Sequence, residues 1–208
     1  MNLSDYFTEL PMIAILRGIQ NHECVEIGHT LVEAGFRCIE VPMNSPNAID
    51  SIALLVKHLP SHILIGAGTV MNQKQIEQVH QVGGRLIVMP HADVAVIRAA
   101  KEMDMICTPG VATLTEAFAA LEHGADALKL FPAESVPPSV LKAWRSVLPA
   151  QTLCLPVGGV RPDGMSAYLQ AGANGFGLGS NLYQAGHTAV QVKIHADAYA
   201  NAWRQDHR

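Results

Sequence analysis

Residues 33–43 read Glu-Ala-Gly-Phe-Arg-Cys-Ile-Glu-Val-Pro-Met and contain the unit from which the chain is built. Gly35 follows a helical pattern, at the place where a left-handed residue ends a helix, and a short aliphatic run comes next. The junction recurs as Glu122-His-Gly124 and Gln170-Ala-Gly172, and Gly83 holds the equivalent place before another run. The stretch therefore predicts a helix-to-strand junction that repeats along the chain.

Short aliphatic runs occur eight times. They are too short for buried helices and lack the alternation of half-buried strands, which is typical of parallel strands covered on both faces. The runs are Met12–Arg17, Cys38–Met43, Leu64–Val70, Leu86–Pro90, Ile106–Gly110, Ala127–Pro132, Cys154–Val160 and Gly175–Ser180. The segments between them carry helix starts, with an N-cap and first-turn proline expected at Ser45-Pro46 and a capping box at Thr113-Leu-Thr-Glu116.

A strand followed by a helix, repeated eight times, can form an open sheet or a closed barrel. Near-equal units with no GxGxxG after the first strand favour the barrel. The sequence thus predicts an α/β fold, a (β/α)8 TIM barrel, in a single domain over residues 1–208. We expect an extra N-terminal helix at Ser4–Leu10 that covers the bottom, and a final outer helix at Thr188–Arg208.

Composition excludes several classes of partner. The 208 residues carry a net charge of −4 and are 49% hydrophobic, which gives no basic surface for nucleic acid. No apolar run approaches the ~20 residues that cross a membrane, and Met1–Asp5 does not resemble a signal peptide. The cysteines form no CxxC pair and are expected to be buried, reduced thiols; they are Cys24, Cys38, Cys107 and Cys154. We expect a cytoplasmic protein that binds neither nucleic acid nor membrane.

Lys129 is the most unusual charged residue, because it interrupts the apolar run Ala127–Pro132. In a barrel it would project into the interior near the carboxyl ends of the strands, where active sites lie. Burial lowers the pKa of a lysine and leaves a nucleophilic amine suited to imine formation. The structural alternative is a lysine that pairs with a buried carboxylate.

Glu40 and Arg17 are further lone charges at the ends of predicted strands. Glu40 could be the carboxylate that pairs with Lys129, or a catalytic acid and base. Arg17 suits a substrate carboxylate, because its planar guanidinium binds carboxylates through two hydrogen bonds. Thr69 offers a hydroxyl near the end of the third strand, although it could equally be an ordinary strand threonine. Each residue alone could be structural, but together they predict one site.

Glycines gather at the ends of the last two strands, in Val157-Gly-Gly-Val160 and Gly177-Leu-Gly-Ser180. Barrels commonly bind phosphate at this place, through backbone amides that glycine lets a ligand approach. We therefore expect Gly158, Gly159, Gly179 and Ser180 to bind a phosphate, although either motif alone could serve only a turn. The predicted ligand is a small phosphorylated molecule whose reactive end lies near Lys129.

Metal chemistry is the competing mechanism, because the chain has ten histidines. None has the HxH or HExxH spacing of a metal site, and most fall in predicted helices or loops. His91 is the one histidine placed near the predicted site, with no role assigned to it. We expect no metal and no cofactor.

These residues, in this order, resemble the small class I aldolases that cleave 2-keto-3-deoxy-6-phosphosugar acids. The resemblance covers nearly the whole chain and is most specific in four motifs. They are Ile15-Leu-Arg-Gly18, Ile39-Glu-Val-Pro42, Gly66-Ala-Gly-Thr-Val70 and Ala127-Leu-Lys-Leu-Phe-Pro132. It implies that Lys129 forms the Schiff base, Glu40 moves the proton, Arg17 and Thr69 bind the substrate carboxylate, and the glycines hold the phosphate. It also implies a homotrimer.

Two departures within the family favour a substrate of the galactonate configuration over its gluconate epimer. Asn44 stands where the gluconate enzymes usually carry Arg, and Val157 where they tend to carry Thr. The nearest rival is the same chemistry on the gluconate epimer or on 4-hydroxy-2-oxoglutarate. More distant rivals are a phosphate-binding barrel isomerase and a barrel that only binds its ligand.

Overall fold

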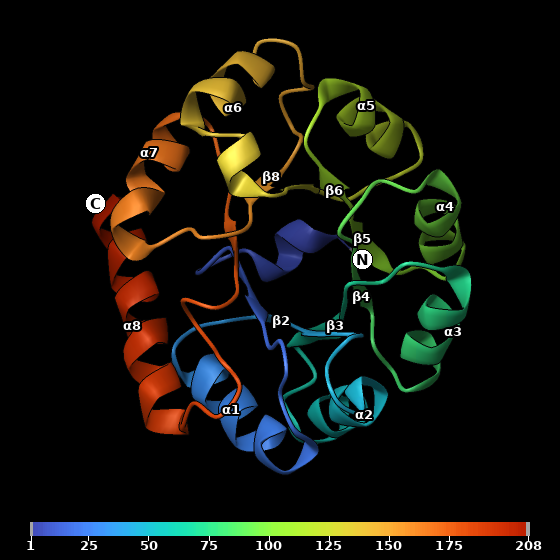
Figure 1. Ribbon diagram of the computed structural model, residues 1–208, viewed down its shortest axis with the longest axis vertical. Helices are drawn as coiled ribbons and strands as arrows, with labels where there is room; N and C mark the ends of the chain where they lie inside the picture. The colour runs from blue at the N-terminus through green and yellow to red at the C-terminus, as the bar shows by residue number, and fades with distance from the viewer. Residues whose placement is uncertain (1, 207–208) are drawn as a thin grey trace.

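The computed structural model describes residues 2–206, and within this range short parallel strands alternate with helices as the repeat predicts. The strands are β1 (Met12–Ile15), β2 (Cys38–Pro42), β3 (Leu64–Gly68), β4 (Leu86–Val88), β5 (Ile106–Thr108), β6 (Gly110–Val111), β7 (Leu128–Leu130), β8 (Cys154–Pro156) and β9 (Phe176–Leu178). The α-helices are α1 (Asn21–Glu33), α2 (Ala48–His58), α3 (Gln73–Gln81), α4 (Val94–Glu102), α5 (Leu114–Glu122), α6 (Pro138–Trp144), α7 (Met165–Gln170) and α8 (Ala189–Asp206). Figure 1 shows the helices as an outer ring around the strands.

The strands form a curved parallel sheet. One part has the order β5-β4-β3-β2-β1-β9 and the other the order β6-β7-β8. An isolated parallel bridge between Val157 and Gly177 joins the end of β8 to β9. The predicted strand Ile106–Gly110 is interrupted at Pro109, which has no N–H for a ladder, so that it appears as β5 and β6. The repeated strand-helix unit of an α/β fold is confirmed.

The inner face of the sheet carries its own hydrophobic cluster, separate from the larger one under the helices. Its buried members are Leu3, Ile13, Cys38, Leu64, Leu86, Val88, Ile106, Ala127 and Leu155. Side chains two residues apart on a strand share a face, so Glu40 follows Cys38 and Lys129 follows Ala127 on this inner face. The apolar cluster thus fills the N-terminal part of the interior and leaves the two charged groups at the other end.

Most of the predicted helix ends are confirmed. The capping box joins Thr113 and Glu116 at the start of α5, and the glycines before four strands have the left-handed backbone expected of them. They are Gly35, Gly83, Gly124 and Gly172. The predicted cap at Ser45 is wrong, because α2 begins at Ala48, and the Ser45 hydroxyl instead accepts a hydrogen bond of 2.9 Å from the Gly18 amide.

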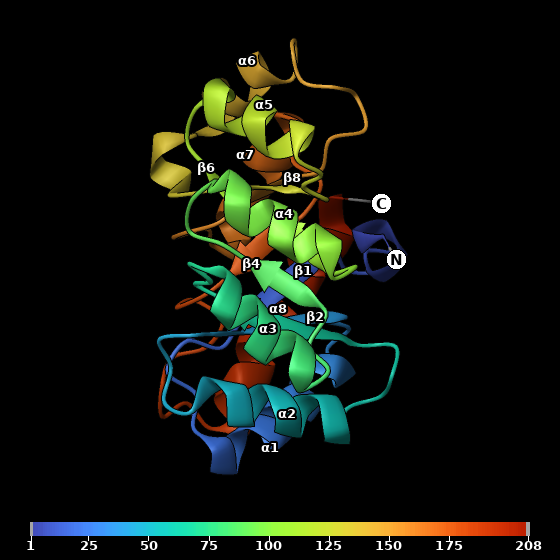
Figure 2. The same cartoon turned by 90° about the vertical axis from the view of Figure 1, so that its right-hand side faces the viewer.

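The predicted N-terminal helix, Ser4–Leu10, is shorter than expected. The structure has a 3-10 helix there, η1 (Leu3–Tyr6), whose first residue packs on the inner cluster with 2% of its surface exposed. Figure 1 shows η1 in the centre of the ring, and Figure 2 shows it to one side of the strands. The predicted last helix, Thr188–Arg208, is α8, and the final two residues of that range lie outside the described residues.

Two further expectations concern the whole chain. The four cysteines are free and buried, as predicted. Among the described residues, no helix combines the length and the hydropathy that crossing a membrane would need.

Candidate active site

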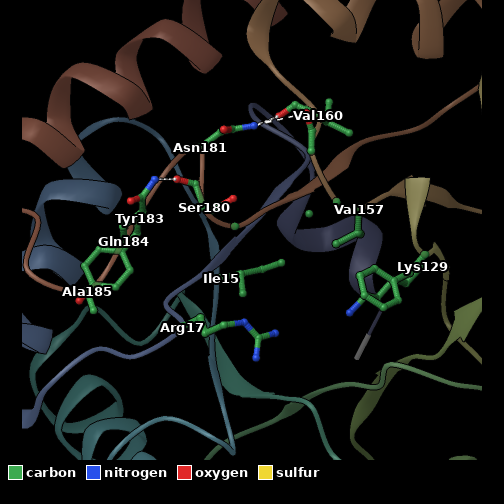
Figure 3. Close-up of a pocket in the computed structure, with 15 residues that line it drawn as sticks. Ile15, Arg17, Lys129, Val157, Val160, Ser180, Asn181, Tyr183, Gln184 and Ala185 are labelled. Carbon is green, nitrogen blue, oxygen red and sulfur yellow. Dashed lines mark hydrogen bonds between the residues drawn. The ribbon is translucent and has the colours of Figure 1, made fainter. Parts of the chain in front are cut away.

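A cavity of about 610 Å³ lies at the carboxyl ends of β1, β7, β8 and β9 (Figure 3). Six of the eight predicted site residues line it, and they are Arg17, Lys129, Gly158, Gly159, Gly179 and Ser180. Glu40 and Thr69 are outside this lining but interact with residues in it, as described below. Val157, which the sequence singled out for substrate preference, also lines the cavity, whereas the sequence assigned no role to other lining residues such as Phe131, Asn181, Tyr183 and Gln184.

Lys129 lies on β7 with 6% of its surface exposed. Its Nζ is 4.5 Å from the centroid of the Phe131 ring, a contact that favours the charged amine modestly. Within residues 2–206, no ion pair of 4.0 Å or shorter joins Lys129 to a carboxylate. Burial lowers the pKa of Lys129, the carboxylate of Glu40 raises it, and Arg17 lowers it further. The net lowering makes the neutral, nucleophilic amine more accessible than in water.

Glu40 lies on β2 with 2% of its surface exposed, and its Oε2 has no hydrogen-bond partner among residues 2–206. Burial raises the pKa of Glu40 to about 7, although the charges of Lys129 and Arg17 and the Gly68 backbone act in the opposite direction. A carboxyl group that titrates near neutrality can both accept and release a proton at the pH of a cell. A buried oxygen without a hydrogen-bond partner destabilises the folded state, so its presence favours a functional role for Glu40 over a structural one.

Gly68 leaves the space that the Glu40 carboxyl group occupies. A Cβ built on Gly68 would overlap both carboxyl oxygens and the carboxyl carbon of Glu40, and these are its three nearest atoms. The Gly68 backbone is not in the left-handed region, so glycine is needed here for its small size. The absence of a side chain at Gly68 thus determines where the Glu40 carboxyl group lies within the interior.

Arg17 extends from the loop after β1 and is exposed to the cavity. Its Nη1 donates to Asn44 Oδ1 at 2.8 Å, and its Nη2 donates to Thr69 Oγ1 at 3.5 Å. Thr69 has a φ of 55°, a left-handed conformation that costs a β-branched residue about 1–3 kcal/mol. Strain of this kind persists only where surrounding contacts hold it, which distinguishes Thr69 from an ordinary strand threonine.

The predicted phosphate-binding glycines form one wall of the cavity. Gly158 and Gly159 have φ values of 109° and 67°, which only glycine adopts at little cost. Asn181 Nδ2 donates to the carbonyls of Gly159 and Val160 at 3.3 and 3.2 Å and so ties the loop after β9 to the loop after β8 (Figure 3). A Cβ on Gly179 would meet nothing within 4 Å, so this residue faces open space. The glycines leave the backbone of this wall accessible to a ligand, which suits the binding of an anion by backbone amides.

His91 does not line the cavity. Its ring is half-buried, and its Nδ1 has no hydrogen-bond partner within the described part of the chain. Among the described residues, no group of three or more His, Cys, Asp or Glu side chains could hold a metal ion.

Residues 3–195 match the family model described as KDPG and KHG aldolase. The chain belongs to this family. It is 42% identical to the 2-dehydro-3-deoxy-6-phosphogalactonate aldolase of Escherichia coli (strain K12), over 95% of this chain and 97% of that protein. It is 45% identical to the probable 2-dehydro-3-deoxy-6-phosphogalactonate aldolase of Rhizobium meliloti (strain 1021), over 94% of this chain and 92% of that protein. A solved structure described as native KDPGal superposes with a TM-score of 0.94 at 41% identity, covering 99% of this chain and 98% of that one.

Membership of the KDPG and KHG aldolase family confirms the resemblance drawn from the four motifs. It favours carbon–carbon bond cleavage over the isomerase and the pure binding module.

Proposed function

We propose that this chain is a class I aldolase that cleaves 2-dehydro-3-deoxy-6-phosphogalactonate into pyruvate and D-glyceraldehyde 3-phosphate, with Lys129 as the Schiff-base residue. The observation that carries the proposal is the buried amine of Lys129 in a cavity that is also lined by the cation of Arg17 and by the glycines after β8 and β9. This arrangement suits a ligand with a carboxylate at one end, a ketone beside it and a phosphate at the other end. The names of the two similar enzymes agree with such a substrate.

In the proposed reaction the neutral Lys129 amine attacks the C2 ketone to give a carbinolamine, which takes up a proton, loses water and becomes a cationic imine. Glu40 in its ionised form then removes the proton of the C4 hydroxyl, directly or through a water. The C3–C4 electron pair moves into the imine, which releases glyceraldehyde 3-phosphate and leaves an enamine. Glu40 returns its proton to C3, and hydrolysis of the imine releases pyruvate and frees the amine. No cofactor or metal enters these steps.

Substrate contacts follow from the same placement. Arg17 and Thr69 bind the carboxylate, and the backbone of Gly158, Gly159, Gly179 and Ser180 binds the phosphate, with Ser180 also offering its hydroxyl. Val157 lines the cavity between the two ends and presents methyl groups. A hydroxyl group in its place would change the preference between C4 epimers by about 1–3 kcal/mol through a gained or lost hydrogen bond. The apolar residue favours the galactonate configuration.

We further propose that residues 1–208 form a single domain, a closed (β/α)8 barrel with η1 over its N-terminal end. The bridge between Val157 and Gly177 and the adjacency of β5 and β6 support closure. Free buried thiols suit a cytoplasmic enzyme, because disulfides form in oxidising compartments. The family resemblance implies a homotrimer, for which light scattering would give three times the 22.3 kDa chain.

The imine is tested by borohydride reduction in the presence of pyruvate, followed by mass spectrometry of the peptides. We expect a carboxyethyl group on the peptide that contains Lys129, no labelling of Lys129→Ala, and full labelling of Lys142→Ala, whose side chain is exposed on α6. Full labelling of Lys129→Ala would refute the mechanism. Pyruvate release from the two C4 epimers, with and without a chelator, then tests the substrate and the absence of a metal.

A further inference from the structure

The Arg17 guanidinium is held by side chains from two neighbouring loops. Asn44 follows β2 and accepts from Nη1 at 2.8 Å, and Thr69 follows β3 and accepts from Nη2 at 3.5 Å. Three consecutive strand-helix loops thus meet at one cation. The Asn44 contact is the shorter of the two and is the one that geometry favours as a full hydrogen bond.

The backbone beside Asn44 is fixed to the backbone beside Arg17. The next residue, Ser45, is 7% exposed, and its hydroxyl accepts from the amide of Gly18 at 2.9 Å. The Ser45 amide donates to the Pro42 carbonyl at 2.8 Å in a turn directly after β2. Adjacent residues of one loop therefore contact adjacent residues of the other, so that Asn44 Oδ1 reaches Arg17 from a rigid base although both side chains are exposed.

The partners of Arg17 are neutral. Within residues 2–206 no carboxylate lies within 4.0 Å of its guanidinium, and both hydrogen bonds go to uncharged oxygens. A neutral acceptor restricts the arginine rotamer without cancelling the positive charge. The charge remains available to a carboxylate ligand and acts on the two buried titratable groups that face it, Lys129 on β7 and Glu40 on β2.

We infer that Asn44 is a positioning residue, which aims the Arg17 guanidinium into the cavity and keeps its charge uncompensated for the carboxylate of the substrate. The inference rests on the proposed function, because it takes the ligand to be a 2-keto acid. Figure 3 shows the Arg17 side chain extending into the cavity that Lys129 enters from β7. Asn44 does not line this cavity, so it acts through Arg17.

Two substitutions of Asn44 distinguish the effect of moving the Arg17 charge from the effect of compensating it. Asn44→Ala removes the acceptor and lets the arginine side chain rotate, whereas Asn44→Asp keeps the acceptor in place and adds a compensating charge. Asn201→Asp is the matched control, since it adds the same charge at an exposed position on α8. The full chain is used for each variant, with three measurements: kcat and KM for cleavage, the midpoint pH of pyruvate trapping by borohydride, and the melting temperature.

For Asn44→Ala we expect KM to rise roughly tenfold with a smaller change in kcat, as for the loss of one hydrogen bond to a charged group. For Asn44→Asp we expect a larger rise in KM and a trapping midpoint at higher pH, because a compensated Arg17 no longer lowers the pKa of Lys129. Asn201→Asp should match the wild type in all three measurements.

The inference is overturned if both Asn44 variants keep a KM within about twofold of the wild type. It is also overturned if they lose activity equally, with lower melting temperatures and an unmoved trapping midpoint, which would make Asn44 merely structural. Failure of the proposed function gives a different result, since the wild-type chain itself would then not be trapped by pyruvate.

Discussion

Gly68→Ala tests whether the position of the Glu40 carboxyl group within the interior controls catalysis. The added methyl group would overlap the three carboxyl atoms of Glu40, so the carboxyl group has to move by about the length of a bond. The backbone at Gly68 is not left-handed, so alanine itself introduces no conformational strain. The perturbation therefore acts directly on the Glu40 carboxyl group and reaches Lys129 only through the charge of Glu40.

The size of the effect can be estimated in two ways. Overpacking of a filled interior costs about 1–3 kcal/mol, which would lower the melting temperature by several degrees. A shift of about 1 Å in a catalytic group costs roughly 100-fold in rate. We expect Gly68→Ala to reduce kcat by about that factor in a pyruvate-release assay coupled to lactate dehydrogenase. Imine formation with pyruvate, followed by borohydride trapping, should be retained because Lys129 still lies in its cavity.

A double-mutant cycle with Glu40→Ala isolates the contact. Once the carboxyl group is removed, the methyl group has space, so Gly68→Ala should have little further effect on kcat in the Glu40→Ala background. The reasoning is refuted if Gly68→Ala alone retains the wild-type kcat. Equal losses of kcat in the two backgrounds would refute it as well, because the methyl group would then act elsewhere than on Glu40.

Three other predictions concern charge and phosphate. The value of kcat/KM should fall as pH drops through about 7, because Glu40 must be ionised to accept the proton, and the apparent pKa belongs to its pair with Lys129. Glu40→Gln should remove a pH dependence of stability. Because the folded-state pKa of Glu40 is raised, the free energy of unfolding of the wild type, measured by urea denaturation, should decrease as pH rises from 4.5 to about 7. The free energy of unfolding of the variant should stay constant over that range. Gly159→Ala, at a φ of 67°, should raise the KM of the phosphorylated substrate, while trapping of pyruvate, which has no phosphate, should be unaffected.

The parts of the fold that could be predicted are those determined by residues that lie close together in the sequence. Glycines before the strands and the capping box at Thr113 follow from backbone geometry, and both are present. The strands follow from short aliphatic runs. Ser45-Pro46 by itself predicts the start of a helix. In the structure the Ser45 hydroxyl instead accepts a hydrogen bond from the Gly18 amide of another loop, and α2 begins at Ala48. A tertiary contact has overridden a local preference there.

The candidate site likewise has features that could be predicted from the sequence and features that could not. Lys129 and Glu40 could be found because a charge within an apolar run has few structural explanations. The contacts of Arg17 with Asn44 and Thr69 could not, since they join residues 27 and 52 positions apart through side-chain orientations that no pattern encodes. Tyr183 and Gln184 line the cavity from a loop of ordinary composition and carried no signal either. The sequence thus indicated Lys129, Glu40, Arg17 and Thr69 as candidate site residues, but it did not indicate that Asn44 and Thr69 would be hydrogen-bond partners of Arg17.

Burial shifts the pKa values of Lys129 and Glu40 in opposite directions, and this allows one cavity to serve both steps that the proposed mechanism assigns to them. The ordinary pKa values of lysine and glutamate, 10.5 and 4.5, are far apart, so a lysine beside a glutamate in water would simply keep its proton. Here burial raises the pKa of Glu40 to about 7 and lowers that of Lys129, which narrows the gap from both sides. Arg17 lowers both pKa values, so it favours the neutral Lys129 that attacks the ketone in the proposed mechanism and the ionised Glu40 that later accepts the C4 hydroxyl proton. In the proposed mechanism Arg17 therefore both binds the substrate carboxylate and favours the reactive protonation states of Glu40 and Lys129, so its placement should affect kcat as well as KM.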